Sequence, residues 1–165
     1  MNRLAAVRHF SAILLLALWF GGFTFYALAV VPTGHQVLRS KVRQGFITQQ
    51  VTNKLNALGG VALGVLLWEL LATRRTHGRG RRFQWAVLSW ALLAATLAAL
   101  CWLHGRLDAQ LDFTQRTVLD DGVFYQWHRA YLIVATIQWL GMVVHFASLL
   151  AGLESRRETP DASRL

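Results

Sequence analysis

Four long apolar stretches that carry almost no charge dominate this 165-residue chain. They cover residues 9–31, 55–73, 83–103 and 128–153. Each holds roughly 19–26 residues, enough at a helical rise of about 1.5 Å per residue to cross a hydrocarbon core about 30 Å thick. Backbone amides in lipid need hydrogen-bond partners within their own segment, so these stretches are predicted to be helices. The sequence therefore predicts an all-α fold, a four-transmembrane-helix bundle.

Composition supports membrane insertion over a soluble fold. Hydrophobic residues make up 55% of the chain and charged residues only 15%, whereas soluble domains carry about 25% charged residues. The net charge of +9 comes largely from basic residues beside the apolar stretches, where such residues fix topology and contact anionic lipid. The expected partner is therefore the lipid bilayer and not nucleic acid, because no nucleic-acid-binding module is present. Cys101 is the only cysteine, which excludes an intramolecular disulfide.

The polar segment after the first stretch predicts a short additional helix. Pro32 and Gly34 are expected to end the first span. Apolar residues about every four positions within residues 35–53 predict an amphipathic helix that lies at the interface or leads into the second span. A signal-peptide cleavage site around Ala29 is the alternative for the first stretch, and its length favours a retained helix.

The distribution of charge between the stretches predicts the orientation. Five arginines lie between the second and third stretches, and the loop after the third is net acidic. The positive-inside rule places the arginine cluster and both termini in the cytoplasm, although the basic segment 39–54 runs against this pattern. We expect one domain over residues 1–153, a disordered cytoplasmic tail over residues 154–165, and insertion in the bacterial inner membrane.

Histidines gather at the predicted outer end of the bundle. His35 follows the first span, His104 ends the third, and His128 begins the fourth. If the third helix continues beyond His104, then Asp108 and Asp112 follow it at four-residue spacing on the same face. Imidazole and carboxylate in this pattern suit a divalent transition metal, and imidazole also ligates haem iron. The predicted metal ligands are His35, His104, Asp108 and His128.

A purely structural interpretation of the same end stays open. An aromatic belt at the membrane interface is the alternative, formed by Trp102, Tyr125, Trp127 and Tyr131. Asp108 can pair with Arg106 in place of binding a metal.

The fourth span carries polar residues at seven-residue spacing. Tyr131, Gln138 and His145 line one stripe, which is expected to face protein because polar side chains avoid lipid. His145 is expected at the cytoplasmic side, at the depth of His9 and Glu69. Polar groups at both ends suggest either a transmembrane electron or proton path or two rows of interface residues. The predicted cofactor-binding residues are His104, His128, Tyr131 and His145.

Glycines recur in the first two stretches. Gly21 and Gly22 lie in the first, and Gly59, Gly60 and Gly64 lie in the second. Gly60 and Gly64 have the GxxxG spacing that lets helix backbones approach closely. We expect these residues to support packing within the bundle.

Three short segments of the sequence are distinctive. Residues 18–32 place a tryptophan before paired glycines and end in Val-Val-Pro; the others are residues 103–108 and 124–131. Together they resemble an uncharacterised four-helix bacterial membrane family whose eukaryotic relatives include a transmembrane protein linked to platinum-drug resistance. The resemblance implies four membrane helices, without an established reaction. The positions it points to are His104, Asp108, His128 and Tyr131.

More distantly, the first helix is similar to copper-resistance D-type membrane proteins and to the haem-associated protoporphyrinogen oxidase of bacteria. The chain departs from both patterns. Met1 and Met142 are its only methionines, and no lysine lies within the fourth stretch.

Two function classes fit the sequence. One is a small membrane protein that binds haem, as haem b, or a transition metal at its outer face. The alternative is an accessory or assembly subunit of a larger respiratory, photosynthetic or transport complex, or a homo-oligomer. An enzyme or transporter is less expected, because the chain has no serine nucleophile elbow, P-loop, HExxH motif or paired intramembrane carboxylates.

Overall fold

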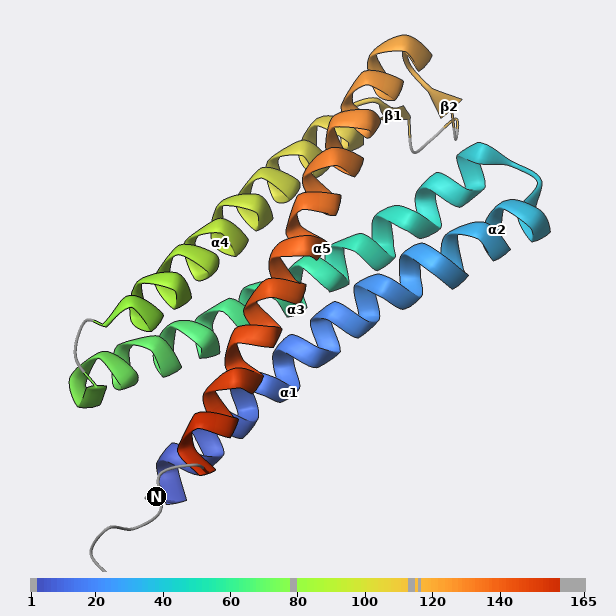
Figure 1. Cartoon of the computed structure of the whole chain (residues 1–165). Coiled ribbons are helices and arrows are strands. Elements are labelled where there is room, and N and C mark those ends of the chain that lie inside the picture. Colours follow the sequence, from blue (N-terminus) through green and yellow to red (C-terminus); the bar gives the residue numbers. More distant parts are fainter. Residues whose placement is uncertain (1–2, 78–79, 113–114, 116, 158–165) are drawn as a thin grey trace, which may run out of the picture.

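Helices make up most of the computed structural model, which describes residues 3–77, 80–112, 115 and 117–157 (Figure 1). The elements are α1 (Arg3–Phe25), the π-helix η1 (Tyr26–Val30), α2 (Val31–Leu38), α3 (Lys41–His77), α4 (Arg81–Asp108), β1 (Leu111–Asp112), β2 (Thr117–Val118) and α5 (Asp121–Arg157). Four helical segments are long and apolar enough to cross a membrane: Arg3–Leu38, Arg43–Arg74, Phe83–Asp108 and Asp121–Leu150. The four predicted spans are confirmed, and the chain is an integral membrane protein.

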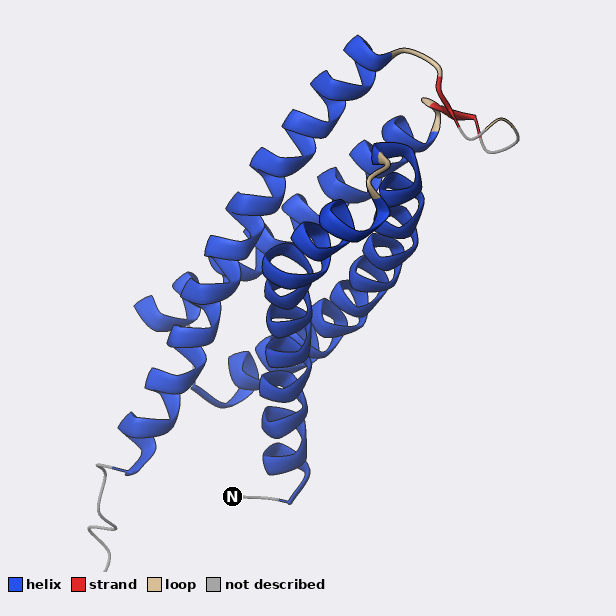
Figure 2. Ribbon diagram, turned by 90° about the vertical axis from the view of Figure 1, so that its right-hand side faces the viewer, coloured by secondary structure: helices blue, strands red, loops and turns tan. Residues whose placement is uncertain are grey.

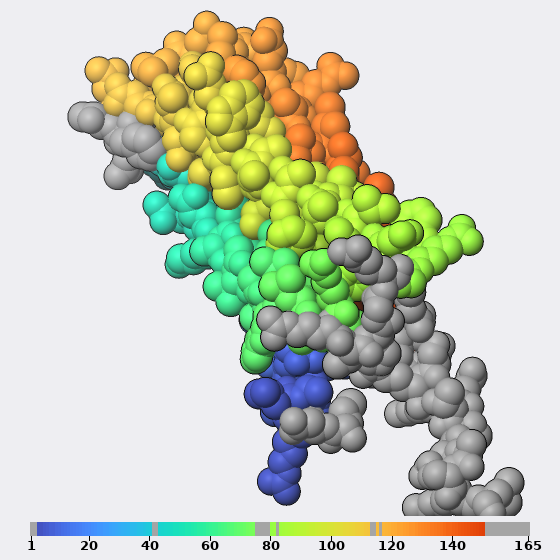
Figure 3. Space-filling view, turned by 90° about the vertical axis from the view of Figure 1, so that its left-hand side faces the viewer, coloured from blue at the N-terminus to red at the C-terminus, as the bar shows by residue number. Residues whose placement is uncertain are grey.

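The helices run back and forth between two ends of an elongated bundle (Figure 1). The end that holds the start of α1 and the connection between α3 and α4 is called the terminal end below. The opposite end, called the hairpin end, holds the α2–α3 turn and the β1–β2 hairpin (Figure 2). Along the length of the bundle, α3 and α4 lie side by side on the face drawn in Figure 3. The predicted outer histidines therefore share the hairpin end.

The first span does not end at Pro32, as the sequence suggested, but continues to Leu38. Pro32 falls in the first turn of α2, where its missing N–H is least costly. The wider π-helical turn of η1 precedes it and absorbs the change in hydrogen-bond register. The proline therefore does not stop the helix.

The separate interfacial helix predicted after the first span is not confirmed. Residues 35–38 complete α2, and residues 41–53 form the first turns of α3. Between them, Arg39 takes a left-handed conformation with φ of 46°, which ends α2. Ser40 immediately precedes α3, and its carbonyl oxygen accepts a hydrogen bond of 3.1 Å from the Gln44 N–H. The polar segment thus leads directly into the second span.

The segment between α4 and α5 is shorter than expected. A two-stranded antiparallel hairpin pairs Leu111 with Val118. Asp120 caps the next helix, since its Oδ1 accepts a hydrogen bond of 3.0 Å from the Val123 N–H. Consequently α5 begins at Asp121, seven residues before the predicted start of the span at residue 128. It ends at Arg157, inside the predicted tail of residues 154–165, and residues 158–165 lie outside the described residues.

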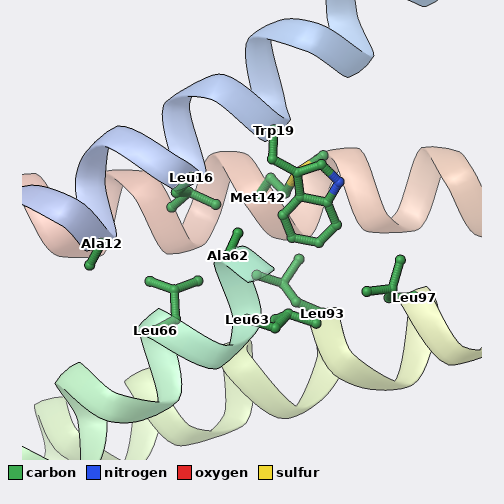
Figure 4. Close-up of a cluster of buried hydrophobic side chains, with 9 residues drawn as sticks. All are labelled: Ala12, Leu16, Trp19, Ala62, Leu63, Leu66, Leu93, Leu97 and Met142. Carbon is green, nitrogen blue, oxygen red and sulfur yellow. The ribbon is translucent and has the colours of Figure 1, made fainter. Parts of the chain in front are cut away.

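The core lies where all four spans meet (Figure 4). It consists of Ala12, Leu16 and Trp19 from α1, Ala62, Leu63 and Leu66 from α3, Leu93 and Leu97 from α4, and Met142 from α5. Two indole N–H groups bond across helices: Trp90 donates to the Leu63 carbonyl at 3.0 Å, and Trp139 donates to Thr24 Oγ1 at 2.9 Å. Tryptophan thus contributes both apolar contact area and a polar link between spans.

The glycines divide into two groups by their surroundings. A Cβ atom on Gly59 would lie 2.6 Å from the Trp19 ring, and one on Gly22 would lie 3.2 Å from Leu55. A Cβ atom on Gly60 or Gly64 would meet nothing within 4 Å. The expectation that the GxxxG pair packs inside the bundle is therefore wrong, because Gly60 and Gly64 face outward and Gly59 makes the close contact.

Large apolar side chains cover the outside of the spans. Phe10, Leu28, Trp85 and Leu132 are each more than half exposed. An apolar surface of this kind suits contact with lipid. The interior, in contrast, contains several polar side chains, and those near the hairpin end form the candidate site.

Candidate functional site

His104 and Tyr131 face each other in the interior near the hairpin end. His104 lies one turn before the end of α4, and Tyr131 lies in the third turn of α5. Their ring centroids are 6.5 Å apart. His104 and Tyr131 are two of the four predicted cofactor-binding residues, and they meet because α4 and α5 pack along each other.

The His104 imidazole is buried and has an unpaired nitrogen. Its Nε2 atom has essentially no exposed surface and no hydrogen-bond partner. The nearest acidic group is Asp108 Oδ2 at 3.6 Å, one helical turn away. That distance is too long for a hydrogen bond. It is close to the separation of about 3.3–3.6 Å between two ligands that each lie about 2.0–2.2 Å from a tetrahedral metal ion.

The expected continuation of the third span past His104 is thus correct as far as Asp108. Asp112 does not share the face of the helix, because it lies in β1. Its Oδ1 accepts a hydrogen bond of 2.9 Å from the Gln115 N–H within the hairpin. The pair available to a metal ion is therefore His104 with Asp108.

The Tyr131 hydroxyl is likewise buried without a hydrogen-bond partner. The side chains of Thr52 and Asn56 in α3 lie close to it. Thr52 Oγ1 donates instead to the Thr48 carbonyl at 2.6 Å. The hydroxyl of Tyr26 in η1, within electrostatic range of Tyr131, is also unpaired. Three spans therefore direct polar groups into one region.

Gln138 extends this region toward the middle of the bundle. It is 1% exposed, and neither atom of its amide group has a hydrogen-bond partner. The predicted inward stripe of Tyr131, Gln138 and His145 is confirmed, since Gln138 and His145 are buried and Tyr131 is half-buried. Each buried polar group without a hydrogen-bond partner lowers the free energy of unfolding by about 1–3 kcal/mol relative to a paired one. A bound polar group that supplied partners would remove this cost.

His35 and His128 lie at the same end but not in this site. His128 is half-buried and stacks on Phe124, with ring centroids 6.0 Å apart and planes 6° from parallel. It faces a surface pocket that it shares with Tyr125, Arg129 and Leu132. His35 is exposed on α2. In the part of the chain that the structure describes, no three His, Cys, Asp or Glu residues form a group able to hold a metal ion. The structure thus does not bring the four predicted metal ligands together.

His145 lies toward the terminal end, in a separate hydrogen bond. Its Nδ1 atom is 2.7 Å from Ser89 Oγ of α4. Nearby in depth, the Glu69 carboxylate pairs with Arg8 through Oε2, and its Oε1 lies 3.2 Å from His9 Nδ1. The expected grouping of His9 with Glu69 is confirmed, while His145 contacts Ser89 instead.

Sequence reasoning missed the contribution of α3 to the site. Thr48, Thr52 and Asn56 recur every four residues, a helical stripe of small polar side chains. The pattern is visible in the sequence, but it falls in part within the segment predicted as an interfacial helix. Tyr26 was equally detectable as a phenol within the first apolar stretch.

A comparison of the chain with protein-family models, with curated proteins and with solved structures finds no match in any of the three. The function therefore has to be argued from the site itself.

Proposed function

We propose that this protein binds haem or a single transition-metal ion inside its hairpin end, with His104 as the principal ligand. The observation that carries the proposal is the buried Nε2 atom of His104, which has no hydrogen-bond partner. Buried polar atoms in proteins are almost always paired, so an unpaired imidazole nitrogen is a sign of a missing ligand. Imidazole nitrogen is the commonest protein ligand for haem iron and for zinc or copper.

Haem requires fewer protein ligands than a metal ion without a porphyrin. A haem iron needs only one or two protein ligands, so His104 alone can hold it. The unpaired Tyr131 hydroxyl, across from the imidazole, can donate a hydrogen bond to a group bound there. Among the residues that the structure describes, a metal ion without a porphyrin has only His104 and Asp108, so its other ligands have to come from water or substrate. When bound, the cofactor supplies redox or Lewis-acid chemistry, while the chain orients it and excludes water.

The test is an absorbance spectrum and a metal analysis of the protein purified in mild detergent. The variant His104→Ala removes the proposed ligand, and His35→Ala removes an exposed histidine at the same end as a matched control. A Soret band lost only in His104→Ala supports haem, and a stoichiometric metal without that band supports the metal ion. Protein with neither group, or equal losses in both variants, contradicts the proposal.

We also propose that the hairpin end faces away from the cytoplasm of a bacterium and that the chain sits in the inner membrane. Arg74 and Arg81 bracket the α3–α4 connection at the terminal end, and the positive-inside rule favours the cytoplasm for such a connection. Reporter fusions in the β1–β2 hairpin and in the α3–α4 connection test this orientation. Activity of a cytoplasmic reporter in the hairpin contradicts it.

An accessory subunit of a larger membrane complex is the second candidate. The observation that favours it is the outward-facing pair Gly60 and Gly64, which leaves the backbone of α3 open to close approach by another helix. Size analysis and mass spectrometry after purification in mild detergent test this candidate. A monomer without any co-purifying chain contradicts it.

A further inference from the structure

An apolar groove of about 420 Å³ runs along the first span at the hairpin end. One wall comes from η1 and α2, and the other comes from the first turns of α3. Its lining includes Phe25, Ala29, Val37 and Ile47, and almost all of the exposed lining is apolar. Along the first span it extends from Phe25 to Leu38, roughly 20 Å at the helical rise. That length exceeds one leaflet of hydrocarbon, about 15 Å.

Specific contacts hold the two walls of the groove in place. The Gln44 side chain donates a hydrogen bond of 2.8 Å from Nε2 to the Val31 carbonyl, which ties α3 to α2. Gly34 makes room for it, since a Cβ atom there would lie 2.7 Å from Gln44 Oε1. The groove is therefore a built feature of the fold.

Positive charge lies at the end of the groove. Arg39 and Arg43 are exposed, and Arg39 directly follows the lining residue Leu38. Among the described residues, no ion pair joins Arg39 or Arg43 to the aspartates that the hairpin end also carries, which are Asp108, Asp112, Asp120 and Asp121. Both arginines belong to the basic segment 39–54, whose charge runs against the positive-inside rule. Membrane topology therefore does not explain this charge.

We propose that the groove binds one acyl chain of an anionic phospholipid, whose phosphate contacts Arg39 and Arg43. The medium beside an apolar groove in a membrane span is lipid, and hydrocarbon chains match its lining. Arginine heads at the interface attract anionic lipid in particular. The two arginines thus select an anionic head group, and the apolar groove selects a lipid over a soluble phosphate.

Native mass spectrometry of the full-length protein in detergent tests the proposal with three probes. These are phosphatidylglycerol, phosphatidylcholine with the same acyl chains, and glycerol phosphate without chains. We expect a preference of about tenfold to thirtyfold for phosphatidylglycerol over phosphatidylcholine, as two arginine contacts allow. Glycerol phosphate is expected not to bind. Equal binding of the two lipids, or binding of glycerol phosphate alone, overturns the proposal.

Matched variants separate the groove from the charge. Ala29→Trp fills the groove and is expected to weaken binding of both lipids, whereas Ala27→Trp places the same side chain at an exposed position of η1 and is expected to leave binding unchanged. If Ala29→Trp does not fold, as judged by size-exclusion chromatography, Ile47→Trp fills the groove from its other wall. Equal binding in the filled and control variants overturns the proposal.

The charge arm uses two double variants. Arg39→Gln with Arg43→Gln is expected to remove the head-group preference while binding of phosphatidylcholine persists. Arg3→Gln with Arg74→Gln removes two exposed arginines at the terminal end and is expected to keep the preference. A loss of preference in the terminal-end pair alone, or equally in both pairs, contradicts the assigned site.

Discussion

At the terminal end the buried Glu69 carboxylate meets both Arg8 and His9, whereas at the hairpin end the buried Nε2 atom of His104 has no hydrogen-bond partner. Two side chains of α5 differ in the same way, one being paired and the other unpaired. The His145 ring bonds to Ser89, while the Tyr131 hydroxyl is unpaired. His9 Nε2 is the exception at the terminal end, because it too is unpaired.

Polar residues that look alike in the sequence therefore have different roles at the two ends. Paired groups at the terminal end link α1 to α3 and α4 to α5, which is a structural role. Unpaired groups at the hairpin end weaken the protein unless a ligand contacts them. The two ends therefore differ in how they should respond to mutation.

The largest effect is expected from Glu69→Ala. It leaves the partly buried Arg8 cation beside His9 without a counter-charge, which is expected to lower the free energy of unfolding by about 3 kcal/mol. Unfolding in mixed micelles of a mild detergent and SDS measures the change. Asp121→Ala, at an exposed carboxylate on the opposite end, serves as the control. Similar losses in the two variants contradict a structural role for the Glu69 pair.

A smaller loss is expected from Gly59→Ala, in the middle of the bundle between the two ends. The new Cβ atom would lie 2.6 Å from the Trp19 ring, and the overpacking is expected to cost about 1–3 kcal/mol. Gly60→Ala is the control, because a Cβ atom there meets nothing within 4 Å. It is expected to stabilise the helix by about 0.5–1 kcal/mol. Equal changes in the free energy of unfolding of the two variants, measured in the same assay, would contradict the close contact at Gly59.

Ser89→Ala probes the second structural pair of the terminal half. The change leaves His145 Nδ1 without its partner and is expected to cost about 0.5–2 kcal/mol. Ser148→Ala provides the comparison, since the Ser148 hydroxyl bonds only to the His145 carbonyl in its own helix. Thermal unfolding in detergent should separate the two variants, and an equal shift would remove the case for a linking bond.

The smallest change, with the opposite sign, is expected from Tyr131→Phe at the hairpin end. Removal of an unpaired buried hydroxyl is expected to leave the stability of the cofactor-free protein unchanged or to raise it by up to about 1 kcal/mol. Tyr125→Phe, at an exposed tyrosine of the same helix, controls for the substitution itself. A loss as large as that of Ser89→Ala would mean that the hydroxyl has a partner after all.

The four spans could be predicted because charges are costly in lipid, so most charged residues lie between the apolar stretches. Their ends could not, because helices continue past the hydrocarbon core through polar residues. The first helix was expected over residues 9–31 and runs over Arg3–Leu38, since hydropathy does not register where a hydrogen-bonded helix stops. Pro32 misled the prediction because its effect depends on its position within the turn.

The candidate site was predictable where it depends on a single helix. The pairing of His104 with Asp108 and the stripe from Tyr131 to His145 follow from helical periodicity alone. The contact between Ser89 and His145 and the outward position of His128 were not predictable. Both depend on how α4 and α5 rotate and slide against each other, which is set by packing in three dimensions.

Hydrogen exchange measured by mass spectrometry, with and without added hemin, tests most directly whether the hairpin end is the ligand-binding end. Added protection is expected in residues 48–56 and 101–108, which carry Thr52, Asn56 and His104. No change is expected around Arg8, Glu69 and Ser89. Substituting His104 with alanine should abolish this protection, and His35→Ala should not. Protection centred on the terminal end, or none with either hemin or zinc, would contradict the account.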